Sequence, residues 1–352
     1  MRQQLGEERM NSRERVQAAL QRKEPDRVPY CELGVDRALA RKLLGWDEPG
    51  DQAASLESNT YNVEEAKALA SYLQKDNICY VLRAPVYAHK ESGKDGRLFY
   101  GEGMLRTEKD LRKLYLPDPH DDALYAGAEA FLEQKDDYSA WLVTRFGIFP
   151  TMLGMGLERF SIALYDNLSL IEDILDHYCD WAIAVANHVC SMDFDVFVTT
   201  DDIAYKTSPF FSPEVFENLM LPRYRRLAET LSLPWIFHSD GNILPFLDDL
   251  SDLGVSGLHP IEDGAMDIRA VKREYGDKFC LLGNVNLNLL GLGTPEAVDC
   301  EVKGLIRDVG SGGGYMVTSG NSLAGYLKPD NVIAMSEAVQ KYGKYPLQQC
   351  GE

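Results

Sequence analysis

The chain has 352 residues, of which 45% are hydrophobic, and carries 36 basic against 55 acidic residues. This length suffices for one large α/β barrel or two average domains. The net charge of −19 argues against nucleic acid or an anionic membrane as a partner, because both bind basic surfaces. A small molecule or another protein is the expected partner.

Cysteine usage and the N-terminus indicate the compartment. The seven cysteines are scattered and form no Cys-X-X-Cys pair, so neither a disulfide framework nor a cysteine-rich zinc site is indicated. The charged N-terminus lacks the apolar core of a secretory signal, and no apolar stretch is long enough to span a bilayer. We therefore expect a cytoplasmic protein that does not cross a membrane.

Short apolar runs alternate with helical patterns along the whole chain. Eight of these runs are candidate strands: 27–32, 78–82, 140–145, 196–200, 235–237, 257–259, 279–282 and 315–318. Apolar residues at three- and four-residue steps predict helices between them, for example at 168–189, 243–253 and 295–309. Alternating strands and helices are typical of a parallel sheet. Eight strands predict α/β architecture as a single (β/α)8 TIM barrel over residues 1–352.

Two segments fall outside the alternation. A helical extension is expected before the first strand. The segment 84–139, after the second strand, is too long for one connection and predicts an insertion over the barrel top, with a hairpin at 90–101. The glycine-rich run 310–314 precedes a strand instead of joining a strand to a helix, so it indicates a tight turn and not a phosphate site.

Three residues of the types that bind metals are spaced through the middle of the chain. Asp202 and His238 each end an apolar run, the place where a barrel enzyme displays its catalytic groups. Glu217 lies between them, in the second turn of a helix that Ser212 and Pro213 begin. Carboxylate and imidazole ligands suit Zn²⁺, and three protein ligands with one open position are typical of catalytic zinc.

Each of these residues also has an ordinary interpretation. Acids at strand ends are often helix caps or solvated loop residues, and a single histidine is more often a core or surface residue than a ligand. The joint pattern favours metal binding because Asp202 and His238 end parallel strands at the same side. Asp240 is a fourth candidate catalytic residue, either as a ligand or as a partner that orients His238.

Further polar and aromatic side chains follow the predicted strands. Among the polar ones are Glu32, Asp201, His259, Glu262 and Ser319. Aromatic residues near the same ends are able to line a pocket for a ring-shaped substrate, although such residues usually serve packing. The candidate substrate-binding residues are Arg83, Tyr87, Arg145, Phe146, Tyr205, Asn284 and Asn321.

Several motifs together resemble one known superfamily. They are the segments 11–20, 24–29, 201–202, 212–214, 238–242, 281–285 and 312–317. Across nearly the whole chain they resemble the uroporphyrinogen decarboxylase-like superfamily, in particular its cobamide-dependent methyltransferase branch. The resemblance implies a (β/α)8 barrel, in agreement with the strand count.

Differences within that superfamily narrow the expected activity. True decarboxylases carry an arginine-rich N-terminal segment and an aspartate after the second strand, and neither is recognisable at 30–35 or 81–85. Methyltransferases acting on thiols bind zinc through His-X-Cys and a later Cys, where this chain has His238-Ser-Asp240 and Ser319. Soft sulfur ligands tune zinc for thiolate chemistry, so their loss argues against a thiol acceptor.

The spacing Asp202-X14-Glu217-X20-His238 resembles instead the zinc signature of the substrate-side methyltransferases of corrinoid-dependent O-demethylases, with Asp in place of a first Glu. The resemblance implies that an aromatic methyl ether, such as a methoxylated benzoate or phenol, gives its methyl group to the Co(I) of a separate corrinoid protein. Zn²⁺ is then the bound metal, and the partner carries the cobamide. Arg83 or Arg145 is expected to pair with a ring carboxylate.

Other activities remain open at this point. One is methylcobamide-dependent transfer to a thiol or pterin acceptor, and another is demethylation of a quaternary amine. A divergent decarboxylase-like enzyme and a corrinoid-associated binding protein without catalysis are further alternatives. A homodimer is a candidate assembly.

Overall fold

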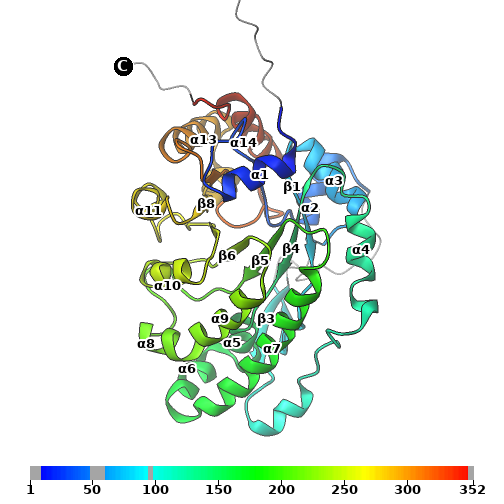
Figure 1. Cartoon of the computed structure of the whole chain (residues 1–352), viewed down its shortest axis with the longest axis vertical. Coiled ribbons are helices and arrows are strands. Elements are labelled where there is room, and N and C mark those ends of the chain that lie inside the picture. The colour runs from blue at the N-terminus through cyan, green and yellow to red at the C-terminus, as the bar shows by residue number, and fades with distance from the viewer. Residues whose placement is uncertain (1–8, 48–59, 94–97, 348–352) are drawn as a thin grey trace, which may run out of the picture.

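The computed structural model describes residues 9–47, 60–93 and 98–347. Within them, seven strands form one curled sheet in the order β1-β4-β5-β6-β7-β8-β9, and every neighbouring pair is parallel (Figure 1). The strands are β1 (Asn77–Val81), β4 (Ser139–Thr144), β5 (Val196–Thr200), β6 (Trp235–His238), β7 (Gly257–His259), β8 (Cys280–Leu282) and β9 (Tyr315–Met316). Each corresponds to a predicted strand.

The strand predicted at 27–32 is not formed, and the expectation of eight strands is corrected to seven. This segment makes isolated backbone contacts instead. Cys31 N donates to Val317 O, Val317 N donates to Pro29 O, and Asp76 N donates to Tyr30 O. Since Pro29 has no N–H, a longer ladder is interrupted there. The segment thus forms backbone hydrogen bonds with residues beside both edge strands, β9 and β1, without being a strand itself.

Helices cover the outer face of the sheet. They are α7 (Leu168–Val189), α9 (Leu221–Thr230), α10 (Leu247–Asp252), α11 (Ile268–Tyr275), α12 (Leu287–Leu292), α13 (Pro295–Val309) and α14 (Pro329–Tyr342). The bounds of α7 and α13 are those predicted, whereas the helix expected at 243–253 is a 3-10 turn, η4 (Leu244–Phe246), followed by α10. Among the described residues no helix is long and apolar enough to cross a membrane.

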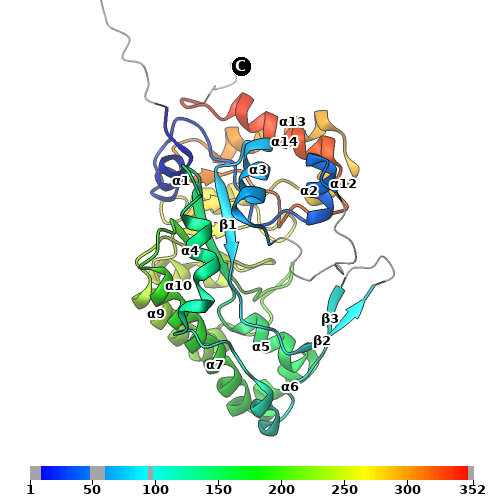
Figure 2. The same cartoon turned by 90° about the vertical axis from the view of Figure 1, so that its right-hand side faces the viewer.

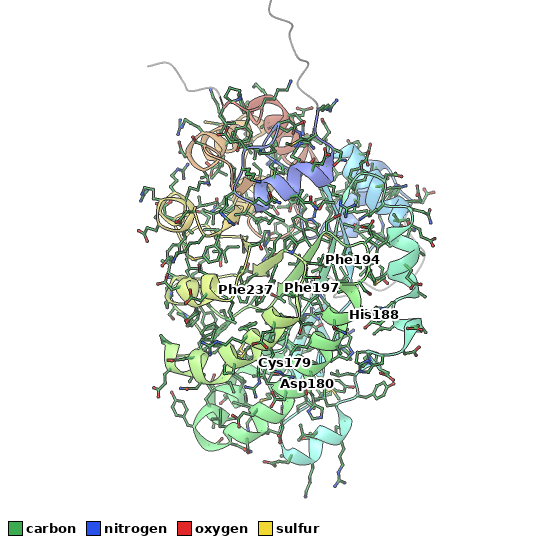
Figure 3. The ribbon with its side chains drawn as sticks, viewed as in Figure 1. Cys179, Asp180, His188, Phe194, Phe197 and Phe237 are labelled. Atoms are coloured by element: carbon green, nitrogen blue, oxygen red, sulfur yellow. The ribbon has the colours of Figure 1, made fainter. Side chains whose placement is uncertain are left out.

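The core has two parts because successive strand residues point to opposite faces. Phe197 of β5 and Phe237 of β6, labelled in Figure 3, belong to the outer cluster, which also includes Cys179 of α7. Their neighbours Val196 and Ile236 belong to a second cluster on the inner side. The sheet is therefore buried on both faces, as a parallel sheet requires.

The N-terminal extension closes one end of the sheet. It begins with α1 (Ser12–Leu20), which packs Val16, Ala19 and Leu20 into the inner cluster. Figure 1 shows α1 at the same end of the molecule as α13 and α14. Next come α2 (Arg37–Leu44) and α3 (Val63–Tyr72). Since α1 fills this end, the opposite end, where the strands terminate, is left for a site.

The inserted segment after β1 contains the predicted hairpin. β2 (Ala88–Ser92) and β3 (Leu98–Gly103) are antiparallel, and Figure 2 shows them projecting beside α5 and α6. Residues 94–97 of the predicted hairpin and Cys350 lie outside the described residues. The other elements of this half of the chain are η1 (Glu108–Lys113), η2 (Asp122–Leu124), α4 (Ala126–Leu132), α5 (Ile148–Met155), α6 (Leu157–Asp166), α8 (Pro213–Val215) and the π-helical turn η3 (Phe216–Met220).

Candidate functional site

Three metal-type ligands converge where β5 and β6 end. One side-chain ligand atom from each of Asp202, His238 and Asp240 lies within 4.8 Å of the others. Asp202 follows β5 by two residues, and His238 ends β6. His238 Nε2 is 3.6 Å from Asp202 Oδ1, and the backbone N of Asp240 donates to Asp202 Oδ1 at 3.0 Å. Two of the predicted ligands are therefore neighbours, with Asp240 beside them.

The structure does not bring Glu217 to this group. Its helix begins as predicted, with Ser212 as N-cap and Pro213 at the first position, but its side chain is exposed. Burial and the neighbouring Glu217 charge raise the pKa of Asp249 in α10, so Glu217 lies toward α10. The buried side chains of its own turn are Phe216, Leu219 and Met220.

The environment of Asp240 favours a cation. Its Oδ2 accepts from Asn321 Nδ2 at 2.6 Å, whereas its buried Oδ1 has no hydrogen-bond partner among the described residues. Burial, followed by the charges of Asp202 and Glu262, raises the pKa of Asp240 to about 8. Unpaired buried carboxylates that repel one another are costly unless a positive charge joins them. Two carboxylates and an imidazole fit a divalent ion of the zinc type.

A second histidine supports His238. His238 and His259 are paired residues of β6 and β7, and their Nδ1 atoms are 2.7 Å apart. Burial lowers the pKa of His238, and burial followed by the neighbouring His238 lowers that of His259 well below its usual value. Both shifts favour the neutral form of these rings, and the 2.7 Å separation requires that one Nδ1 donates a proton to the other.

A cavity of about 240 Å³ lies beside Asp240. Lys206 stands at its wall with Nζ 3.4 Å from Glu262 Oε1, and Glu262 Oε2 accepts from the backbone N of Gly241 at 2.8 Å. The lining is mostly polar and comprises Lys206, Asp240, Glu262, Asp263, Asn286, Leu287, Asn288, Gly320, Asn321 and Tyr326. Tyr326 is the one aromatic residue in this lining, so the walls differ from the aromatic pocket that the sequence predicts.

Three predicted substrate-binding residues lie near the ligand group. Asn321 lines the cavity and holds Asp240. Arg83 lies close enough for its charge to contribute to the lowered pKa of His238, after burial. Tyr205 is 52% exposed, and its backbone O accepts from Asn242 N on the loop after β6.

The other predicted substrate-binding residues have different surroundings. Phe146 is buried and stacks on Tyr224 with ring centroids 4.9 Å apart, so it belongs to the core. The Tyr87 hydroxyl donates to the backbone O of Tyr115 at 2.6 Å. The Asn284 amide donates to the backbone O of Ile261 at 2.7 Å.

Arg145 directly follows β4 and lies beside Asp201, which directly follows β5. Its guanidinium is 5.9 Å from the centre of the Phe149 ring. Burial raises the pKa of Asp201 to about 6, against the lowering effect of backbone N–H donors and of Arg145. The Asp201 carboxylate accepts from the backbone N of Phe146 and Gly147, which gives it a structural role at the start of α5.

One buried acid across the sheet positions the loop that carries Asn321. Glu32 accepts from the Ser319 backbone N at 2.8 Å and from Ser319 Oγ at 2.7 Å. Burial raises the pKa of Glu32 to about 7, although the Ser319 hydrogen bonds oppose this. Sequence reasoning placed Glu32 and Ser319 at strand ends without a role. Their contact joins residues 287 positions apart, and sequence spacing gives no signal for such a pair.

Comparisons with known proteins place the chain among two kinds of relatives. It is 22% identical over 317 residues to the methylcobamide:CoM methyltransferase MtaA of Methanosarcina barkeri, covering 90% of this chain and 79% of MtaA. It is 25% identical over 350 residues to a uroporphyrinogen decarboxylase of Methylobacillus flagellatus, covering 91% of this chain and 94% of that protein. Overall sequence identity therefore does not distinguish a methyltransferase from a decarboxylase.

The fold has a solved counterpart. A methyltransferase from Methanosarcina mazei superposes with a TM-score of 0.74 at 20% identity, covering 95% of this chain and 99% of that one. This likeness confirms an α/β fold built on a curled parallel sheet. The profile of the uroporphyrinogen decarboxylase (URO-D) family matches residues 102–342. The chain belongs to the uroporphyrinogen decarboxylase (URO-D) family.

Proposed function

We propose that this chain is a corrinoid-dependent methyltransferase that takes the methyl group of an aromatic methyl ether and passes it to the Co(I) of a separate corrinoid protein. The observation that carries the proposal is the convergence of Asp202, His238 and Asp240 beside a cavity at the strand ends. The similarity to a methylcobamide:CoM methyltransferase over 90% of the chain supports methyl transfer. In this proposal the segment 29–31 takes the place of an eighth barrel strand.

The ligand types favour an oxygen-bound methyl donor over a thiol acceptor. Among the described residues, the group that is able to hold a metal contains two carboxylates and an imidazole, and no cysteine joins it. Sulfur ligands favour thiolate chemistry, whereas a mixed oxygen and nitrogen set leaves zinc a harder Lewis acid. An ether oxygen suits such an ion.

Asp202, His238 and Asp240 would hold Zn²⁺. When bound, the ion supplies Lewis-acid stabilisation of the negative charge that develops on the leaving oxygen. Asn321 holds Asp240 in place through its amide, and Lys206 pairs with Glu262 at one wall of the cavity. The ring of Tyr326 offers a flat apolar surface to a donor. The volume of about 240 Å³ lies below the usual range of ligand pockets, about 300–1,000 Å³, and so favours a one-ring donor.

The charge of the lining supports a second donor class. Asp240, Glu262 and Asp263 face the cavity, and Lys206 is the one cationic residue in this lining. An excess of acidic groups favours a cationic ligand over an anionic one. A quaternary amine is therefore the alternative methyl donor, and methoxybenzoates should be poorer donors than neutral methoxyphenols.

Metal content and methyl transfer test the proposal together. The purified chain is expected to hold about one zinc and to form methylcobamide when mixed with a reduced corrinoid protein and a methoxyphenol. Asp202→Asn and His238→Ala should lose both properties and keep the fold, as judged by circular dichroism. Parallel reactions with methoxybenzoates and quaternary amines identify the donor class.

Glu217→Ala is the matched control because the structure places this acid on the exposed side of its helix. It should retain zinc and activity. Loss of zinc in Glu217→Ala would restore the ligand set predicted from spacing. Activity that survives complete chelation would overturn the zinc mechanism and favour a decarboxylase-like reaction.

A further inference from the structure

His238 and His259, next to the ligand group, share one hydrogen bond in which either ring can be the donor. His238 and His259 approach through Nδ1 and Nδ1 at 2.7 Å, and a neutral imidazole carries one N–H. If His259 donates, His238 keeps its proton on Nε2, which lies 3.6 Å from Asp202 Oδ1. If His238 donates, its Nε2 presents a lone pair toward Asp202. Only the second arrangement leaves Nε2 able to bind a cation.

We propose that His259 is a positioning residue that accepts the Nδ1 proton of His238 and so holds the His238 Nε2 lone pair toward Asp202 and Asp240. This inference rests on the proposed metal function. Histidines that bind metals usually donate their other N–H to a carboxylate, carbonyl or water, which fixes the tautomer and the ring orientation. Here a buried imidazole on the adjacent strand occupies that position.

The surroundings of His259 hold its ring in place, and its buried Nε2 has no hydrogen-bond partner among the described residues, so the proton that Nε2 carries when Nδ1 accepts is unpaired. The residue is 1% exposed, and its ring centre is 4.9 Å from that of His238 at an interplanar angle of 29°. Its backbone O accepts from Ser239 N at 3.1 Å, so the main chain beside both rings is fixed. The pair holds two ring protons in either arrangement, and the change of tautomer needs no net proton uptake or release.

A neutral acceptor also affects the bound ion. A carboxylate behind a ligating histidine raises the basicity of the ligand. An uncharged imidazole does so less, which leaves the ion more electron-poor and a stronger Lewis acid. His259 thus orients the ligand without neutralising the metal.

The test measures zinc affinity of the full-length chain by competition with a chromophoric chelator. His259→Asn keeps an amide oxygen near the position of Nδ1, His259→Gln places its amide near Nε2 instead, and His259→Leu has no acceptor. We expect His259→Asn to stay within about threefold of wild type, and His259→Gln and His259→Leu to bind about 10–100-fold more weakly. His177→Leu, at an exposed histidine of α7, controls for loss of any imidazole.

A second readout reports the tautomer directly. Long-range ¹H–¹⁵N spectra of the zinc-bound chain should show His238 protonated at Nδ1. Equal zinc affinity in all three His259 variants would overturn the inference, and so would equal loss in His259→Asn and His259→Leu, because packing alone then explains the effect. If His259→Leu does not fold in a thermal melt, the comparison of His259→Asn with His259→Gln decides.

The outcomes separate this inference from the proposed function. A wild-type chain that binds no zinc refutes both. A wild-type chain that binds zinc and transfers methyl groups, with unchanged affinity in the His259 variants, refutes the role of His259 alone.

Discussion

Replacing Glu32 by Gln should stabilise the chain at high pH and leave its stability nearly unchanged at low pH. Burial raises the pKa of Glu32 from 4.5 to about 7, so the folded state holds this proton more tightly than the unfolded chain does. The favourable contribution of the protonated acid is fully present below pH 4.5 and is lost as the pH rises to about 7. Gln keeps the shape, accepts from Ser319 N and has no charge to bury.

The size of the effect follows from the shift. At about 1.36 kcal/mol per pKa unit, the ionised Glu32 costs about 3 kcal/mol above pH 8. The unfolding entropy is about 2.1 cal/mol/K per residue, or about 0.7 kcal/mol/K for 352 residues. Glu32→Gln should therefore raise Tm by about 4 °C at pH 9 and change it little at pH 4.

Differential scanning calorimetry of metal-free protein across this pH range measures the difference. Glu337→Gln, at an exposed position of α14, is the control and should show no comparable pH-dependent gain. An equal Tm difference at pH 4 and pH 9 would refute the reasoning, because it would mean that Glu32 does not change protonation between the folded and unfolded states in this range.

Two further substitutions test other contacts. Arg15→Ala leaves the buried Asp76 carboxylate without one of its two arginine partners and should lower the free energy of unfolding by about 3 kcal/mol in urea denaturation. The control Lys278→Ala, in an exposed ion pair, should change the free energy of unfolding by less than about 1 kcal/mol. Similar losses in both variants would contradict this prediction. Asn321→Leu removes the amide that holds Asp240 and should weaken zinc binding about tenfold in chelator competition, whereas unchanged affinity would show that Asp240 needs no such support.

Much of the fold follows from local patterns. The strand 196–200 has the bounds predicted from its apolar run, and the helices 168–189 and 295–309 have the bounds predicted from their three- and four-residue steps. The strand is buried on both faces, and each helix buries one side along its length. The segment 27–32 carries the same apolar signal, but Pro29 interrupts a ladder and its partners lie at residues 76 and 317. Local sequence does not report whether such distant partners continue the pairing.

In the candidate site, too, some residues could be predicted from the local sequence and others could not. Asp202 and His238 were predicted because both end buried strands, and their closeness follows from the parallel sheet. Glu217 was predicted from its place in the second turn of its helix and from its spacing to Asp202 and His238, although Phe216, Leu219 and Met220 mark the inward face of that turn. A residue one position after Phe216 is rotated about 100° away, which is a signal that was available in the sequence. The contact between His238 and His259 depended on strand register, which the sequence did not supply.

The backbone bonds of segment 29–31 have a consequence for synthesis of the chain. Tyr30 and Cys31 are completely buried in the folded protein. The backbone N–H of Cys31 donates to the backbone O of Val317, and Val317 leaves the ribosome after most of the chain. Domains generally fold as units during translation, and apolar surface that waits for a late partner promotes aggregation. The segment 29–31 therefore lacks its backbone hydrogen-bond partner until the last strand has been synthesised. Truncation before residue 317 should yield an aggregating product and not a smaller folded unit.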